Sequence, residues 1–182
     1  MNSNVKKMVV SAMLAAIAIA IPMFMPPFLK INLPPFTATL ASHVPLIIAM
    51  FISPWSAVFV TIISAIGFLF AFPDPSVAFR AAMHIFFVLA GAMMIRKDAK
   101  IYWVILVTFV LHTASDMIAV LIYAAAFNPA ILKGTVMSYA QYIIAVGTSI
   151  HHLIDFAISY FICRALYNAG LIKYHVGKKM AD

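Results

Sequence analysis

Long stretches of the sequence run without a charged side chain, and this limits the fold more than any other feature. No Lys, Arg, Asp or Glu lies between Lys7 and Lys30, between Lys30 and Asp74, or between Lys100 and Asp116. Only 9% of the 182 residues are charged, against about 25% in an average soluble domain. Such a chain cannot cover a water-exposed surface. We therefore expect a lipid bilayer as its solvent, in which each spanning helix needs about 20 apolar residues.

The content of hydrophobic residues, 65%, suffices for five or six spanning helices. Intrinsic disorder, a collagen-like repeat and a secreted disulfide scaffold are excluded, the last because Cys163 is the single cysteine. The sequence predicts an all-α integral membrane protein, a six-helix bundle that forms one domain over residues 1–182. The predicted spans are 8–25, 37–52, 55–72, 77–95, 101–126 and 139–167.

A proline-rich segment, 26–36, separates the first two predicted spans and holds four of the ten prolines. Proline pairs prevent helix formation and favour extended backbone, so we expect a structured loop here. Its prolines limit the conformations that it loses on closing over a ligand, and such a loop is suited to be a lid.

The distribution of Lys and Arg predicts the orientation, because these residues collect in cytoplasmic loops. An inward N-terminus places nine of them inside: Lys6, Lys7, Arg96, Lys97, Lys100, Arg164, Lys173, Lys178 and Lys179. Only Lys30, Arg80 and Lys133 then lie outside. Both termini are expected in the cytoplasm. The net charge of +7 follows from this topology, and we expect no nucleic-acid partner.

Ionisable residues inside a span are costly and persist where they pair or line a cavity. The spans hold three pairs at i,i+4 spacing, which places both members on one helix face: Arg80 with His84, His112 with Asp116, and His151 with Asp155. Their depths converge on the outer half and the midplane of the bilayer, where His43 joins them. The two His–Asp pairs fit a structural network and a binding site equally.

Arg80 differs from the other intramembrane groups because its only acidic neighbour within reach along the chain is Asp74, in a loop. It is expected to contact a ligand, to snorkel to headgroups, or to form an ion pair with Asp74. Tyr139 and Tyr142 flank the connection before the last span. They fit a ligand pocket and an interfacial aromatic belt equally.

The first span carries a ladder of small residues, with alanine at every fourth position: Ala12, Ala16 and Ala20. Such a ladder lets another helix approach closely, either within the chain or from a partner. Motifs for chemistry are missing. The sequence contains no Walker A motif, no serine in a GxSxG context and no glutamate, so neither an ATPase nor a known zinc-protease motif is present.

These features together resemble the substrate-binding S component of energy-coupling factor (ECF) vitamin transporters, a resemblance that covers nearly the whole chain. The six short spans, the alanine ladder and the proline-bracketed loop match that family. The segment FTATLASHVPLIIAMFISP, 36–54, is similar to the second-span signature of its niacin, pyridoxine, hydroxymethylpyrimidine and pantothenate branches.

The resemblance implies a binding subunit of the bacterial plasma membrane that is not an enzyme and carries no cofactor or metal. It implies a transmembrane coupling subunit (the T component) and two cytosolic ATPases as partners. Its first long loop would close over the substrate. The family's binding positions correspond to Asn32, Phe36, Arg80, His84, Tyr139 and Tyr142, and its docking positions to Ala12, Ala16 and Ala20. Cobalt and nickel members begin Met-His, whereas Asn2 follows Met1 here.

The expected substrate is a pyridine or pyrimidine vitamin or precursor, hydroxymethylpyrimidine or pyridoxine, because histidines and amides can bind ring nitrogens and hydroxyls. Niacin or pantothenate is the alternative, since Arg80 suits a carboxylate. Two other classes stay open. One is a purely structural membrane partner. The other is an integral membrane metalloenzyme with a ligand set that suits zinc: His112, Asp116, His151 and Asp155.

Overall fold

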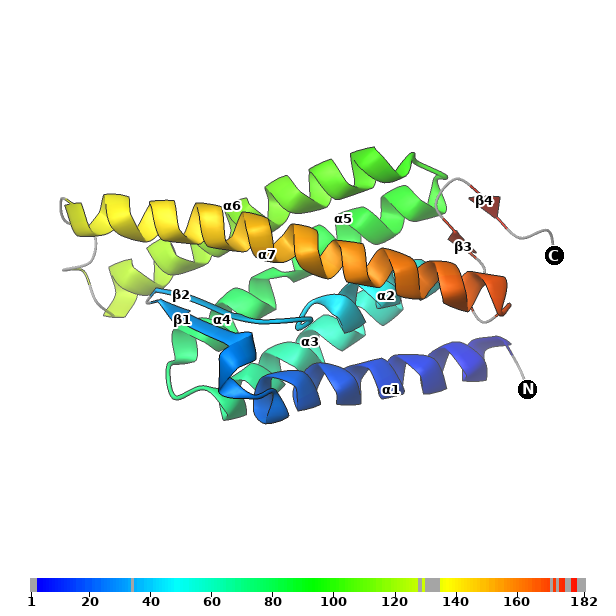
Figure 1. Cartoon of the computed structure of the whole chain (residues 1–182), viewed down its shortest axis with the longest axis horizontal. Helices are drawn as coiled ribbons and strands as arrows, with labels where there is room; N and C mark the ends of the chain where they lie inside the picture. Colours follow the sequence, from blue (N-terminus) through cyan, green and yellow to red (C-terminus); the bar gives the residue numbers. More distant parts are fainter. Residues whose placement is uncertain are drawn as a thin grey trace.

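The computed structural model describes residues 3–33, 35–127, 129, 135–170, 172, 174–175 and 178–179. They form an elongated bundle of helices (Figure 1). Within these described ranges, five helical segments are long and apolar enough to cross a membrane, and five of the predicted ranges coincide with them to within a few residues. These segments are Asn4–Phe24, Pro54–Ala71, Pro75–Arg96, Ile101–Phe127 and Met137–Asn168. This confirms the prediction of an all-α integral membrane protein.

The helices are α1 (Ser3–Phe24), α2 (Val44–Ile52), α3 (Pro54–Ala71), α4 (Pro75–Met83), α5 (Ile85–Arg96), α6 (Ile101–Phe127) and α7 (Thr135–Asn168). A 3₁₀ turn, η1 (Pro27–Leu29), precedes two strands, β1 (Lys30–Leu33) and β2 (Phe36–Thr39). Two short strands near the C-terminus, β3 (Tyr174–His175) and β4 (Lys178–Lys179), pair with each other.

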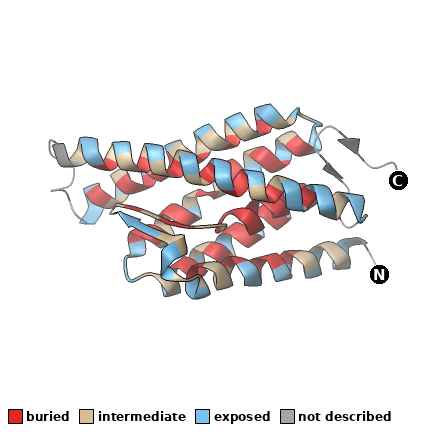
Figure 2. Ribbon diagram, in the orientation of Figure 1, coloured by how far each residue is buried: buried red, intermediate tan, exposed pale blue. Residues whose placement is uncertain are grey.

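The second predicted span, 37–52, is not one continuous helix, and the described residues give five long segments plus the short α2, which leaves the count of six spans unconfirmed. Strand β2 takes the first residues of the range, and only the nine residues of α2 are helical. Proline is tolerated in the first turn of a helix but not in its interior. Pro45 lies in that first turn, so the helix begins at this point. All residues of α2 are buried by the surrounding helices (Figure 2), which shield this short segment from lipid.

The segment predicted as a loop, 26–36, is part of a β-hairpin. Strand β1 pairs antiparallel with β2, from Lys30 opposite Thr39 to Leu33 opposite Phe36. Pro26, Pro27 and Pro35 lie outside the paired positions, because proline cannot donate a hydrogen bond to a strand ladder. Pro26 and Pro27 begin η1, and Pro35 lies in the turn.

The fourth predicted span, 77–95, is broken into α4 and α5 at His84. Helix α4 begins at an Asp74 cap, whose Oδ1 accepts a hydrogen bond from the Ser76 backbone N–H at 2.9 Å. The cap satisfies one of the free donors of the first turn. The break places the His84 side chain in the interior of the bundle, where it is 6% exposed.

The N-terminus of α1 and the C-terminus of α7 lie at the same end of the bundle (Figure 1). The connection between α5 and α6, with Arg96, Lys97 and Lys100, lies at that end as well. The hairpin lies toward the opposite end. Lys133 and Lys173, which also entered the predicted orientation, are outside the described residues.

The outer surface of the bundle exposes many large apolar side chains, whereas a soluble protein exposes mainly polar ones. Large hydrophobic side chains are exposed on several helices, among them Trp55 at 83%, Phe70 at 76% and Phe161 at 68%. Several polar side chains are buried as well, and those of His43, Arg80, His84, Asp116 and Asp155 lie close together inside the bundle. An apolar outer surface around a buried polar cluster is typical of a bilayer-embedded bundle.

Candidate binding site

A small cavity of about 20 Å³ lies in the interior beneath strand β2. One water molecule needs about 10–15 Å³, so the cavity has room for about one water in this conformation. Its wall comes from the hairpin, from the turn before α2 and from four of the long helical segments. The lining residues are Thr37, Ala38, Thr39, Ser42, His43, Phe68, Val77, Arg80, Ala81, His84, Asp116 and His151.

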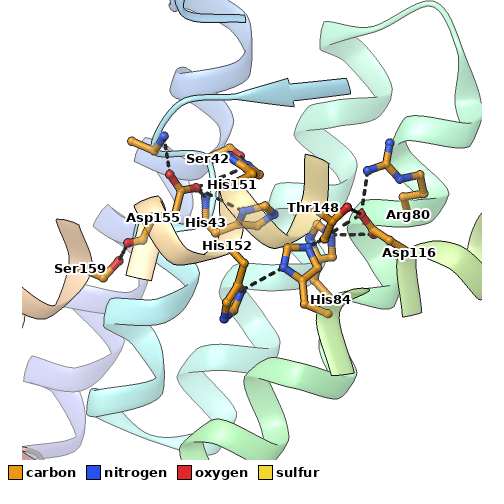
Figure 3. A network of polar contacts seen from close by, with 12 residues as sticks. Ser42, His43, Arg80, His84, Asp116, Thr148, His151, His152, Asp155 and Ser159 are labelled. Carbon is orange, nitrogen blue, oxygen red and sulfur yellow. Dashed lines mark hydrogen bonds and ion pairs between the residues drawn. The ribbon is translucent and has the colours of Figure 1, made fainter. Parts of the chain in front are cut away.

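Asp116 on α6 holds one side of this cavity, and its partners come from neighbouring helices (Figure 3). Arg80 Nη2 donates to Asp116 Oδ2 at 2.7 Å, and Thr148 Oγ1 donates to the same oxygen at 3.0 Å. His84 Nε2 lies 3.3 Å from Oδ1. Asp116 is only 1% exposed, so its negative charge is compensated inside the bundle by the Arg80 guanidinium.

Arg80 therefore has an acidic partner that sequence spacing did not reveal, and it neither snorkels nor pairs with Asp74. It is 6% exposed, and Asp74 caps α4 instead. Arg80 Nη1 also donates to the Pro35 carbonyl at 3.1 Å, and its guanidinium lies 5.8 Å from the centre of the Phe36 ring. The same side chain thus joins the hairpin to α6.

Asp155 on α7 is the second buried carboxylate, and its partners are mainly backbone groups. The N–H groups of Ala41 and His43 each donate to it at 2.9 Å. Ala41 has a φ of 65°, a left-handed conformation that is costly for a residue with a Cβ. Asp155 thus fixes the strained turn that leads from β2 into α2. His151 Nε2 lies 3.5 Å away, on the same helix face.

A chain of imidazoles runs between the two carboxylates and continues into the bundle. His84 Nε2 lies 3.2 Å from His112 Nε2, and His112 Nδ1 lies 2.9 Å from His152 Nδ1. His152 Nε2 lies 3.1 Å from Thr108 Oγ1. The His43 ring packs against His84, His112 and His151 with ring centres 4.5–4.6 Å apart. The three polar pairs of the sequence thus lie together in one network.

Four buried polar atoms around the cavity have no hydrogen-bond partner among the described residues. They are Thr37 Oγ1, Thr39 Oγ1, His43 Nδ1 and Arg80 Nε, all on residues that line it. His43 Nδ1 lies 3.2 Å from an Asp155 oxygen but at an angle unsuited to a hydrogen bond. Each unsatisfied buried polar atom costs about 1–3 kcal/mol. The cavity therefore offers donors and acceptors that a polar ligand or water can satisfy.

Two groups of side chains bring nitrogen or oxygen ligand atoms within 4.8 Å of one another and could hold a metal ion. The first is His43, His84 and His112, and the second is His43, His151 and Asp155. The metalloenzyme interpretation of the sequence used residues from both groups.

Comparison with known proteins finds one curated relative. Over 165 residues the chain is 30% identical to the niacin transporter NiaX of Lactococcus lactis subsp. cremoris (strain MG1363), covering 87% of this chain and 73% of that protein. The chain belongs to the S-component family of ECF vitamin transporters. No model of a known protein family matches the chain. No solved structure matches it either.

As an S component, the chain is a multi-pass protein of the cell membrane that takes part in vitamin uptake and is not an enzyme. The resemblance drawn from the sequence is confirmed at the level of the family. The metalloenzyme interpretation is set aside, and so is that of a purely structural membrane partner.

The residues carried over from family resemblance lie at three different places in this S component. Arg80 and His84 line the polar cavity, and Phe36 is buried between the hairpin and α7. Asn32 is exposed on β1, opposite Thr37. Tyr139 and Tyr142 are 53% and 66% exposed, and neither lines the polar cavity.

Tyr142 instead lines an apolar groove of about 400 Å³ between the hairpin and α7. The groove shares Ala38 and His151 with the polar cavity. Gly147 lies in its wall, directly against the Phe36 ring. A Cβ at position 147 would come within 2.7–2.8 Å of three ring carbons. The hairpin can therefore approach α7 this closely only over a glycine.

Sequence reasoning did not assign Thr37, Thr39, His43 or Asp116 to the binding site. The available signal was the alternation Phe36-Thr37-Ala38-Thr39, which is typical of a strand with one polar face. Arg80 and Asp116 come together only through the packing of α4 on α6, which residue spacing does not report.

The alanine ladder faces outward from the bundle. Ala12 and Ala16 are exposed and Ala20 is half-buried, whereas Ala15 and Ala18 face the interior. Helix α1 packs inward on α3, where a Cβ at Gly67 would come within 2.9 Å of Ile19. The inward small residues thus serve packing within the chain, and the outward ladder remains uncovered by the described residues.

Proposed function

We propose that this S component binds a pyridine vitamin, with niacin as the first candidate, in the polar cavity beneath the hairpin. One observation carries the proposal: four buried polar atoms without partners among the described residues, two from β2 and two from the bundle, belong to residues that line one cavity. Niacin has a carboxylate and a ring nitrogen. The Arg80 Nε–H group and the threonine hydroxyls supply donors for both.

The relative supports niacin ahead of pyridoxine and hydroxymethylpyrimidine, which sequence reasoning preferred. That protein is named a niacin transporter, and it aligns with most of this chain. Pyridoxine and hydroxymethylpyrimidine share the aromatic nitrogen ring but have no carboxylate. An arginine in the site therefore distinguishes the candidates, since a charge-assisted hydrogen bond to a carboxylate is stronger than a neutral one.

The polar cavity suits a charged vitamin better than the larger apolar groove does. Burying a charged group away from hydrogen-bond partners is costly, and the groove is lined almost entirely by hydrocarbon side chains. The polar cavity is too small for a pyridine ring in its present form. We infer that the hairpin moves aside to admit the ligand and acts as the lid. The bond from Arg80 to the Pro35 carbonyl and the contact of Phe36 with Gly147 hold it closed.

The position of the basic residues supports the predicted orientation, with the ends of α1 and α7 on the cytoplasmic side and the hairpin outside. In this orientation the lid faces the medium from which a vitamin is taken up. The partners proposed are the T component and two cytosolic ATPases. The outward alanine ladder on α1 is the proposed surface for the T component, because small side chains let two membrane helices approach closely.

The vitamin is tested by mass spectrometry of small molecules released from the purified protein, followed by competition binding. The competitors are nicotinate, nicotinamide, pyridoxine, hydroxymethylpyrimidine and pantothenate. Nicotinamide is the matched control, because it keeps the pyridine ring but replaces the carboxylate by a neutral amide. We expect nicotinate to be released and to compete most strongly. Equal competition by nicotinamide would contradict carboxylate recognition, and stronger competition by pantothenate would exclude a pyridine vitamin.

Docking is tested by replacing Ala16 with Trp and purifying the protein with its partners. A large side chain at the centre of the ladder should prevent close approach and abolish co-purification, while vitamin binding to the isolated protein persists. Ala157 is an exposed alanine on α7 and provides the matched control, since Ala157→Trp leaves the ladder intact. Co-purification of the Ala16 variant at the wild-type level would exclude the ladder as the docking surface.

A further inference from the structure

The buried charges of the site do not favour an anionic ligand. Among the described residues, the permanently charged groups buried here are Arg80, Asp116 and Asp155. With neutral imidazoles they sum to one negative charge. A carboxylate would add a second negative charge where little water can enter, and an uncompensated buried charge is unfavourable. A site for niacin therefore needs a positive charge beyond Arg80.

Three neighbouring imidazoles, two of which line the cavity, can bind a cation that supplies this charge. His43, His84 and His112 are 5%, 6% and 0% exposed, and their ring centres lie 4.5–4.6 Å apart in every pair. Each offers a ring nitrogen within 4.8 Å of the other two. They come from different parts of the chain: the turn before α2, the break between α4 and α5, and α6.

The distance between two of these nitrogens matches a shared metal ion. His84 Nε2 and His112 Nε2 lie 3.2 Å apart. A tetrahedral zinc ion binds histidine at about 2.0–2.1 Å, which places two ligand nitrogens about 3.3–3.4 Å apart. The two nitrogens therefore already span one edge of a zinc-sized tetrahedron.

The hydrogen bond behind the His112 ring is typical of a metal-binding histidine. Thr108 Oγ1 donates to the Val104 carbonyl at 2.7 Å, so it accepts from His152 Nε2–H at 3.1 Å. His152 Nδ1 then carries a lone pair and accepts from His112 Nδ1–H at 2.9 Å. This assignment leaves His112 Nε2 with a lone pair toward His84. His43 Nδ1 lies 3.2 Å from an Asp155 oxygen, which leaves Nε2 as the His43 nitrogen available to an ion.

We propose that His43, His84 and His112 bind a divalent transition-metal ion of the zinc class, and that the vitamin carboxylate takes its fourth position. His43 and His84 line the polar cavity, so an ion held by them borders the ligand. The ion changes the buried charge from one negative to one positive, which a monocarboxylate neutralises. The ion site stands on this geometry alone, and the carboxylate contact rests on the proposed function.

Ligand atoms of both groups have partners, since His84 Nε2 lies 3.3 Å from Asp116 Oδ1, but the partners of the second group hold the backbone of a turn. Both Asp155 oxygens accept backbone N–H groups, from Ala41 and His43, at 2.9 Å. His151 Nε2 lies 3.2 Å from Ser42 Oγ. An ion there would have to displace bonds that hold the turn before α2.

The metal site is tested with the full-length protein, purified by a tag without histidine, stripped with a chelator and titrated with Co²⁺ alone. We expect one equivalent to bind, with the visible absorption of tetrahedral Co²⁺, and Zn²⁺ to displace it. A monodisperse wild-type protein that binds no stoichiometric Co²⁺ or Zn²⁺ would overturn the proposal. The wild-type titration decides this whether or not the variants fold.

Two matched variants locate the ion. His84→Gln and His151→Gln each remove one imidazole that neighbours a buried aspartate. We expect His84→Gln to weaken Co²⁺ binding more than tenfold and His151→Gln to change it by less than threefold. The reverse order would overturn the assignment to His43, His84 and His112 in favour of the group with Asp155.

Vitamin binding is measured separately, so that failure of the ion and of the vitamin are distinguishable. Adding Zn²⁺ to stripped protein should strengthen nicotinate binding at least tenfold and leave nicotinamide unchanged. Ion binding without any nicotinate binding would refute niacin but support the metal site. Tight nicotinate binding to stripped protein, unaffected by Zn²⁺, would overturn the metal–carboxylate contact and assign the positive charge to protonated histidine.

Discussion

The two buried aspartates of this S component, Asp116 and Asp155, are buried to the same extent but bind different kinds of group. Asp155 binds the backbone N–H groups of the turn between β2 and α2, and this turn has a fixed shape. Asp116 binds the side chains of Arg80, Thr148 and His84, two of which line the polar cavity. A carboxylate held by backbone maintains the fold. One held by side chains beside a cavity can exchange partners with a ligand.

The largest effect is expected at Asp155. Asp155→Ala leaves two buried N–H groups without an acceptor and releases the left-handed turn at Ala41, so the free energy of unfolding should fall by about 3–5 kcal/mol. Tryptophan fluorescence of Trp55 and Trp103 during thermal unfolding in detergent measures this. Asp155→Asn is the control, since its amide oxygen keeps an acceptor for one of the two N–H groups, and it should lose less stability. Equal losses for Asp155→Asn and Asp155→Ala would mean that these hydrogen bonds do not maintain the turn.

The second effect concerns the affinity for the vitamin and the partner of Asp116, Arg80. Arg80→Ala removes a charge-assisted contact worth about 1.5–3 kcal/mol, so nicotinate binding should weaken roughly ten- to a hundredfold. Arg80→Lys retains the charge but loses the Nε–H donor and the planar fork, and should lie between the alanine variant and the wild type. Titration with labelled nicotinate measures both. Unchanged affinity together with a lower melting temperature would make Arg80 a structural residue like Asp155.

The third effect concerns the proposed lid, the hairpin that Arg80 contacts through the Pro35 carbonyl. Gly147→Ala places a Cβ within 2.7–2.8 Å of the Phe36 ring and should hold the hairpin away from α7, raising the vitamin off-rate about tenfold. Gly67→Ala is matched to it, because it crowds Ile19 between α1 and α3, far along the chain from the lid. Equal changes in off-rate for the two variants would show a general loss of packing instead.

The smallest effect is expected at Asp74, the acidic residue that sequence spacing offered as the partner of Arg80. Asp74→Ala removes the cap of α4 and should cost about 1 kcal/mol of stability. Vitamin affinity should stay within twofold of the wild type. A loss of affinity as large as that of Arg80→Ala would mean that Asp74 and Arg80 act together after all.

The spacing of residues along the sequence predicted the side-chain pairs that form within a single helix. His112 with Asp116, and His151 with Asp155, share a face because residues four apart in a helix must do so, and both pairs lie within 4 Å. The membrane-spanning segments followed from hydropathy for the same local reason. The common level of the polar pairs followed from counting residues along each span.

Contacts between elements could not be predicted in this way. The ion pair of Arg80 with Asp116 depends on how α4 rotates against α6, and the backbone acceptor role of Asp155 depends on a turn in another segment. The predicted span 37–52 joined the residues of β2 and α2 into one helix. A short apolar run does not show whether it forms a short buried helix or part of a longer span. Pro45 and the alternating threonines were the signals that could have separated them.

A lysine joins the α1 helix to the hairpin. Pro26 has no N–H to offer the Pro22 carbonyl four residues earlier, and Lys30 Nζ donates to that oxygen instead, at 3.0 Å. Lys30 is also the first residue of β1. A force that tilts α1 is therefore transmitted to the hairpin at its base. We expect a partner that binds α1 with such a tilt to change the affinity for the vitamin, and thermodynamic reciprocity then requires the vitamin to change the affinity for that partner by the same factor.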